Sequence, residues 1–182
     1  MLFEVVMAGF GGQGILYMGD LLAEAALNEG RNVTFLPTYG VAMRGGTANC
    51  VVTVSDAEIG SPLLDHPHAA VVMNQQSLRK FQSSVRPGGV IVANSTMIDP
   101  NALEVGGDIR MIWIPATEMA RATVGNERSA NMVLLGAFLK AEPVVRVESI
   151  EALVSRGASG PKKDLIEKNV AAFRAGLAYD GS

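Results

Sequence analysis

Glycine-rich segments follow the first two apolar runs of this 182-residue chain, where backbone groups could contact a ligand or another chain. Residues 9–14 read GFGGQG after the apolar run 3–8, and residues 38–46 read TYGVAMRGG after the run 33–37. In an open α/β sheet, ligands bind outside the carboxyl ends of neighbouring strands. We therefore expect both segments to lie at one rim of the sheet, forming one site or one contact surface.

The first segment is typical of a turn that leads from a strand into a helix. Apolar side chains recur at helical spacing at Ile15, Met18 and Leu22, so the glycines precede a helix N-terminus. Free main-chain N–H groups and the positive end of the helix dipole can bind an anion there. Glycines also let a ligand or another backbone approach closely. The segment is therefore either an anion-binding turn or a close-packing turn.

A dinucleotide fingerprint is matched only in part. Gly9, Gly11 and Gly14 fit the pattern GxGxxG, which also needs an acidic residue about 20 positions further on, at the end of the second strand. That strand ends at Thr38 without an acid, and Ile15 stands where a P-loop needs lysine. An independent nucleotide-binding oxidoreductase that uses the GFGGQG loop is therefore kept as an alternative function.

Four motifs together carry a family resemblance. They are GFGGQG at 9–14, TYGVAMRGGTAN at 38–49, IGSP at 59–62 and NERSANM at 126–132. In this combination the chain resembles the gamma subunit of 2-oxoacid:ferredoxin oxidoreductases, such as the 2-oxoglutarate or pyruvate enzymes. The resemblance implies a subunit of a complex that oxidatively decarboxylates a 2-oxoacid with coenzyme A to acyl-CoA and CO2. The isolated chain is not expected to be active.

The same resemblance implies partners and cofactors. Alpha and beta subunits are the expected partners, with delta as a further candidate, and ferredoxin is the expected electron partner of the complex. Thiamine diphosphate, iron–sulfur clusters and coenzyme A are then bound on or with other subunits, and this chain alone binds no cofactor. Its expected contribution is assembly and access to the active site. A pure assembly subunit with no ligand is the second alternative.

The expected rim combines glycines with side chains that can form hydrogen bonds. Arg44 can bind a carboxylate or phosphate through two parallel N–H groups, or pair with a carboxylate of a neighbouring subunit. Tyr39 adds a hydroxyl. No catalytic residue is assigned. The predicted cofactor-binding or subunit-contact rim consists of Gly11, Gly12, Gln13, Gly14, Tyr39, Gly40, Arg44, Gly45 and Gly46.

The remaining reactive side chains predict neither a nucleophile nor a metal site. Cys50 is the single cysteine and lies in the alternating stretch 47–54, so we interpret it as a small buried apolar residue. An iron–sulfur cluster needs about four thiolates. His66 and His68 are the only histidines and lie in one turn beside Pro67. Because no third ligand is fixed by the spacing, we interpret this segment as a surface turn and predict no metal.

The composition indicates a surface covered by other chains. Charged residues make up 18% of the chain and hydrophobic residues 48%, against a typical charged content of about 25%. The isolated chain is therefore expected to dimerise or bind hydrophobic dyes. The net charge is −3 and no basic stripe is present, which argues against nucleic acid as a partner. No apolar run approaches the roughly 20 residues of a membrane span, and no signal peptide is visible, so we expect a cytoplasmic protein.

Strands and helices must alternate to position the two glycine segments. Continuous apolar runs at 69–74, 90–95 and 109–114 indicate strands covered on both faces. We predict a single α/β domain over 1–182, a three-layer α/β/α sandwich with a mainly parallel sheet. Residues 47–54 follow a loop too short for a helical crossover, so we expect them to run antiparallel in a mixed sheet. Asn126 is predicted to cap a helix from 127 to about 142, and further helices are expected at 147–155 and from 161.

Overall fold

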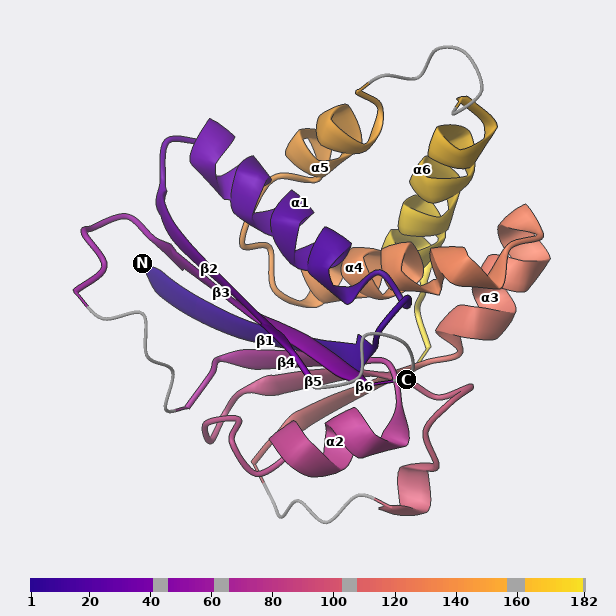
Figure 1. Cartoon of the computed structure of the whole chain (residues 1–182), viewed down its shortest axis with the longest axis horizontal. Helices are drawn as coiled ribbons and strands as arrows, with labels where there is room; N and C mark the ends of the chain where they lie inside the picture. The colour runs from indigo at the N-terminus through magenta and orange to yellow at the C-terminus, as the bar shows by residue number, and fades with distance from the viewer. Residues whose placement is uncertain (41–45, 61–65, 103–107, 157–162, 182) are drawn as a thin grey trace.

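The computed structural model describes residues 1–40, 46–60, 66–102, 108–156 and 163–181. Strands, with helices between some of them, make up the first two thirds of the chain, and the last third is helical (Figure 1). No helix within these ranges is long and apolar enough to cross a membrane. The strands are β1 Leu2–Phe10, β2 Asn32–Tyr39, β3 Thr47–Ser55, β4 Ala69–Val72, β5 Val90–Asn94 and β6 Arg110–Ile114. The helices are α1 Ile15–Asn28, α2 Gln75–Phe81, α3 Ala116–Val124, α4 Ala130–Ala141, α5 Val147–Val154 and α6 Lys163–Ala178.

The strands form one six-stranded mixed sheet in the order β2-β3-β1-β4-β5-β6. β1, β4, β5 and β6 are parallel neighbours, whereas β3 runs antiparallel to both β1 and β2. The antiparallel direction predicted for residues 47–54 is confirmed. The carboxyl ends of β1 and β2 therefore lie at the same edge of the sheet as the amino end of β3.

Helices cover both faces of the sheet, as the three-layer prediction requires (Figure 1). Alternate strand residues point to opposite faces, so β1 contributes Val5 and Met7 to one core and Val6 to the other. The larger core packs the sheet against α1, α3, α4, α5 and α6, and the smaller one packs it against α2. β2 lies at one edge of the sheet and is much less buried than β4 and β5, and its Leu36 and Tyr39 side chains are exposed.

The helical third differs from the sequence prediction in two places. Asn126 does act as a cap, since its side-chain oxygen accepts a hydrogen bond from the main-chain N–H of Arg128. However, the capped element is a 3₁₀ turn, Glu127–Ser129, and α4 begins only after it. Helix α3 was not anticipated, although its sequence carries the usual end signals. Pro115 stands at its start, and Gly125 follows its end with a left-handed φ of 65°.

Helices α4 and α6 pack with their backbones in close contact. α4 is buried over ten consecutive residues, as its all-round apolar sequence predicts. Gly136 of α4 faces the main chain of α6, where a Cβ atom would overlap the carbonyl oxygen of Phe173. Gly176 of α6 likewise faces the carbonyl of Val133. This contact leaves no space for a side chain on either glycine.

We predict that Gly136→Ala destabilises the chain, because the added methyl group must push two packed helices apart. The free energy of unfolding should fall by about 1–3 kcal/mol, the usual cost of overpacking a core. Gly60→Ala is the matched control, because no atom lies within 4 Å of the position that its Cβ would occupy. Urea unfolding of both variants checks this, and equal midpoints for the two would contradict the close packing.

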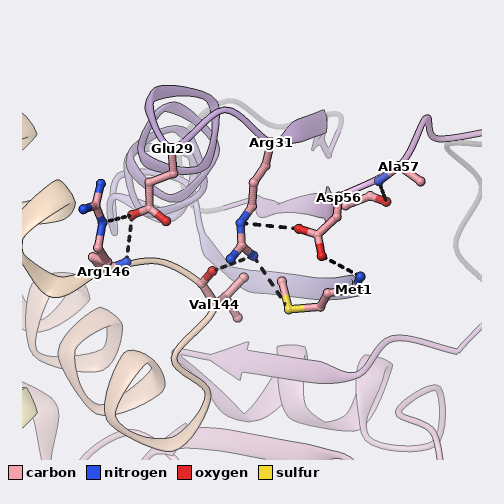
Figure 2. Close-up of polar contacts among 8 residues, drawn as sticks. Met1, Glu29, Arg31, Asp56, Ala57, Val144 and Arg146 are labelled. Atoms are coloured by element: carbon pink, nitrogen blue, oxygen red, sulfur yellow. Dashed lines mark hydrogen bonds and ion pairs between the residues drawn. The ribbon is translucent and has the colours of Figure 1, made fainter.

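A partly buried carboxylate, that of Glu29, joins α1 to α5 at the end of α1 opposite to the GFGGQG loop (Figures 1 and 2). Glu29 Oε1 accepts hydrogen bonds from the Arg146 main-chain N–H at 2.8 Å and the Ser149 hydroxyl at 2.6 Å. Its side chain is only 9% exposed. Nearby, Arg31 donates to the carbonyl oxygen of Val144 at 3.1 Å. These contacts fix the segment that leads into α5.

The ionisation of Glu29 should make this attachment sensitive to acid. Burial alone would raise the pKa of Glu29, but the hydrogen bonds from Ser149 and Arg146 and the Arg146 charge outweigh it and lower the pKa. A carboxyl group with a lowered folded-state pKa stabilises the protein fully above its unfolded value of about 4.3. That contribution is lost as the pH falls through the folded-state pKa.

We therefore predict that Glu29→Gln lowers the free energy of unfolding by about 1 kcal/mol at neutral pH. The difference from the parent chain should shrink as the pH falls below the unfolded-state value and through the lowered folded-state pKa, where the parent carboxylate is itself protonated. Urea unfolding over this pH range measures it, with the exposed Glu58→Gln as control. A difference that is constant with pH would show that the charge of Glu29 is not what holds α5.

Candidate functional site

The loop between β1 and α1 is shaped by glycines with left-handed backbones. The turn closes through a hydrogen bond from the Gln13 N–H to the Phe10 carbonyl at 3.1 Å. Gly12 has a φ of 93° and Gly14 a φ of 75°, values that side-chain-bearing residues rarely adopt. Gly14 then accepts the first helical bond, from the N–H of Met18. A methyl group at Gly12 would thus strain the backbone even though the space around it is open.

The structure brings this loop against the residues that begin β3. The N–H of Gly11 donates to the carbonyl of Gly46 at 2.9 Å, and the N–H of Gly40 donates to Thr47 at 2.8 Å. The sheet register places Phe10 opposite Thr47. The described members of the predicted rim therefore share one edge of the sheet: Gly11, Gly12, Gln13, Gly14, Tyr39, Gly40 and Gly46. Arg44 and Gly45 lie outside the described residues, and the functional role of the whole set stays a prediction.

Two asparagines that the sequence reasoning missed hold this loop in place. Asn74, the N-cap residue of α2, donates to Gln13 Oε1 at 3.3 Å, and Asn131, in the first turn of α4, donates to the Gly14 carbonyl at 3.3 Å. They are 2% and 5% exposed. Each could have been noticed in the sequence as an amide side chain at the border of an apolar run. Asn74 ends the run 69–74, and Asn131 stands at the start of the apolar stretch that forms α4. Because α2 and α4 cover opposite faces of the sheet, the loop is held from both sides.

The sheet order removes the basis for the dinucleotide reading. In the dinucleotide fold, the second strand lies directly beside the first, so its terminal acid reaches the ribose. Here β3 is inserted between β1 and β2. With strands about 4.8 Å apart, the end of β2 is two spacings, roughly 10 Å, from the end of β1. The chain therefore has the GxGxxG spacing, but its second strand does not lie beside the first, as dinucleotide binding requires.

Two tyrosine side chains near the site are exposed, one at the rim and one shortly after the GFGGQG loop in the sequence. Tyr39, the last residue of β2, is 66% exposed, and Tyr17, in the first turn of α1, is 40% exposed. Partial burial and then the nearby Asp20 carboxylate raise the pKa of Tyr17 above its usual value, so its hydroxyl stays protonated. Tyrosines with an accessible ring and a hydroxyl are enriched where proteins contact one another.

Several cavities of about 260–560 Å³ that are lined by described residues lie away from the described residues of the rim. One of about 530 Å³ lies between α5 and α6, and one of about 560 Å³ lies beside Met1 and Leu2.

Cys50 and the two histidines occupy separate environments. Cys50 is fully buried, and burial raises the pKa of its thiol to about 12. His68 accepts a hydrogen bond from the Glu4 main-chain N–H at Nδ1, whereas the Nδ1 of His66 lies 3.2 Å from the Ser84 carbonyl oxygen. Among the described residues, His, Cys, Asp and Glu form no group of three that could hold a metal ion.

Comparison with known proteins gives a consistent match over almost the whole chain. Residues 4–179 match the family described as pyruvate ferredoxin/flavodoxin oxidoreductase. The chain is 34% identical over 177 residues to the 2-oxoglutarate synthase subunit KorC of Methanothermobacter marburgensis, covering 95% of this chain and 94% of that one. It is also similar to a solved keto/oxoacid ferredoxin oxidoreductase gamma subunit from Geobacter sulfurreducens. That structure is 29% identical, with a TM-score of 0.79 and 96% of both chains covered.

A second group of relatives is longer than this chain. The ketoisovalerate oxidoreductase subunit VorA of Methanothermobacter thermautotrophicus is 40% identical over 177 residues, which is 97% of this chain. The chain spans 36% of that relative's length. The same module is therefore found both alone and within larger polypeptides.

The burial of Cys50 predicts that its thiol is chemically inert in the folded chain. Thiolate is the reactive species, and a pKa of about 12 leaves almost none at neutral pH. Ellman's reagent should label less than about a tenth of the folded protein under conditions that label all of it in guanidinium chloride. Rapid, complete labelling of the folded chain would show that Cys50 is accessible and reopen its role as a nucleophile.

Proposed function

The chain belongs to the pyruvate ferredoxin/flavodoxin oxidoreductase family, and we propose that it is the gamma subunit of a multi-subunit 2-oxoacid:ferredoxin oxidoreductase. The complex would oxidatively decarboxylate a 2-oxoacid with coenzyme A to acyl-CoA and CO2, and pass the electrons to ferredoxin. The match to the separate KorC and gamma-subunit chains over more than nine tenths of their length supports the assignment to a separate subunit.

Within that complex, we assign this chain to assembly and to shaping access to the active site. The observation that carries this assignment is the direct hydrogen bond between the two glycine loops, from Gly11 to Gly46, at an edge of the sheet with exposed Tyr39. Gly12, also exposed at this edge, carries no side chain that would keep a neighbouring backbone away. Alpha and beta subunits, with delta as a further candidate, are the proposed partners in the cytoplasm.

The redox chemistry then belongs to the other subunits. Iron–sulfur clusters need about four thiolates, and the single, buried Cys50 does not fit such a cluster. Thiamine diphosphate is likewise assigned to the partners, and coenzyme A is bound on or with them. The two alternatives make different predictions, one for the purified chain and one for the assembled complex. A nucleotide-binding oxidoreductase would bind a dinucleotide by itself, whereas a pure assembly subunit would leave the requirement for coenzyme A unchanged when its rim is altered.

Affinity purification of the tagged chain from its native host tests the assignment. We expect co-purification of the larger subunits and coenzyme A-dependent reduction of ferredoxin by a 2-oxoacid. A chain that purifies without these subunits from cells that express them would overturn the proposal.

The rim assignment makes a separate prediction about Tyr39. Because its ring is largely exposed, Tyr39→Ala should leave the stability of the isolated chain almost unchanged. Loss of a buried tyrosine contact at an interface typically weakens binding by about tenfold or more. We therefore expect lower recovery of the complex at limiting subunit concentration.

Leu27→Ala is the matched control for Tyr39→Ala. Leu27 is 56% exposed and lies near the end of α1 that is remote from the rim, so its loss tests the general effect of removing an exposed apolar group. Equal recovery of the complex with both variants would remove Tyr39 from the contact surface.

A further inference from the structure

The side-chain amide of Gln13 is held in one orientation through its oxygen. Gln13 Oε1 accepts a hydrogen bond from the main-chain N–H of Phe10 at 2.6 Å and another from Asn74 Nδ2 at 3.3 Å. A main-chain N–H can only donate, so the atom that faces Phe10 must be the amide oxygen. Two donors use both lone pairs of that oxygen.

The orientation of Asn74 is fixed in turn by the start of α2. Its Oδ1 accepts a hydrogen bond from the Ser77 main-chain N–H at 2.9 Å and so caps the helix. With the oxygen committed to the cap, the Nδ2 end is left to donate to Gln13. A chain of donors and acceptors therefore runs from the N-terminus of α2 to the GFGGQG loop.

The nitrogen end of Gln13 is what remains available. Among the described residues, Gln13 Nε2 has no hydrogen-bond partner. It is also not among the buried unpaired side-chain atoms of these residues, which are Thr34 Oγ1 and Gln75 Nε2. Gln13 Nε2 is therefore accessible at the rim, next to the exposed, side-chain-free Gly12. Because its oxygen is saturated, Gln13 can offer a new partner only N–H donors.

We infer that Gln13 is a fixed hydrogen-bond donor of the rim, positioned by Asn74, and that it binds an oxygen acceptor on the adjoining subunit. The acceptor is a main-chain carbonyl or a carboxylate, the groups that a neutral amide N–H₂ recognises. This inference rests on the proposed function. A protein partner is favoured over a small ligand because the largely exposed ring of Tyr39 lies at the same edge of the sheet. The open space at Gly12 also allows another backbone to approach.

Two substitutions separate the donor role from the fold. Gln13→Glu keeps oxygens that can accept from Phe10 and Asn74 but removes the N–H donors. Asn74→Ser keeps a capping oxygen for α2, without charge, but replaces the Nδ2 amide that donates to Gln13 with a hydroxyl one bond shorter. Gln76→Glu is the control for the added charge, since Gln76 is exposed in the first turn of α2.

Each variant is purified as the tagged chain and titrated with the remaining subunits of the parent complex, and the Kd of assembly and the apparent KM for coenzyme A are measured. Gln13→Glu should raise the Kd by about tenfold or more, because an acceptor on the partner is left unpaired. Asn74→Ser should raise it less, and Gln76→Glu should leave it unchanged. Hydrogen exchange at the Phe10 amide should stay slow in Gln13→Glu, showing that the loop itself is intact.

A parent-like Kd together with a parent-like apparent KM for coenzyme A in Gln13→Glu, in a system where the parent chain assembles and is active, would overturn the donor role. An unchanged Kd with a raised apparent KM for coenzyme A would place the acceptor on a ligand and overturn the assignment to a subunit. If the parent chain itself does not assemble with the other subunits, the proposed function fails instead, which distinguishes the two failures.

Discussion

Strand β3 runs antiparallel between β1 and β2, and the arrangement of the rim depends on that direction. Its amino end pairs with the carboxyl ends of both neighbours, so Thr47 lies opposite Phe10 while the backbone of Gly46 meets Gly11. A parallel strand in this place would enter the sheet at the opposite edge and separate the two glycine loops. The same insertion moves β2 away from β1 and makes the GxGxxG spacing unsuitable for a dinucleotide.

The loop that this sheet positions is held by groups from both helical layers. Asn131 binds Gly14 from α4, and Asn74 binds Gln13 from the start of α2. α4 is itself buried between the sheet and α6, where Gly136 permits close backbone contact. The loop therefore has a defined shape before any partner arrives, which reduces the entropy lost when a complex forms.

Much of this architecture follows from sequence patterns with a local cause. Continuous apolar runs predicted β4, β5 and the edge strand β6, and the short connection before residues 47–54 predicted the antiparallel strand. The edge position of β2 and the existence of α3 were missed, because coverage of a strand depends on distant helices and a nine-residue helix carries little periodicity. The position of each glycine segment directly after an apolar run predicted that the two loops would lie at one rim. It could not reveal that Asn74 and Asn131 hold them, since those contacts join residues 61 and 117 positions apart.

The central claim is that the edge formed by the two glycine loops is where this chain contacts the rest of an oxidoreductase complex. A cryo-electron microscopy structure of the complex purified through the tagged chain tests it directly. The account predicts that Gly12, Gln13 and Tyr39 are buried against another subunit, with an oxygen of that subunit within hydrogen-bond distance of Gln13 Nε2. A complex in which these residues face solvent, while the chain is held through another surface such as α5 and α6, would contradict it.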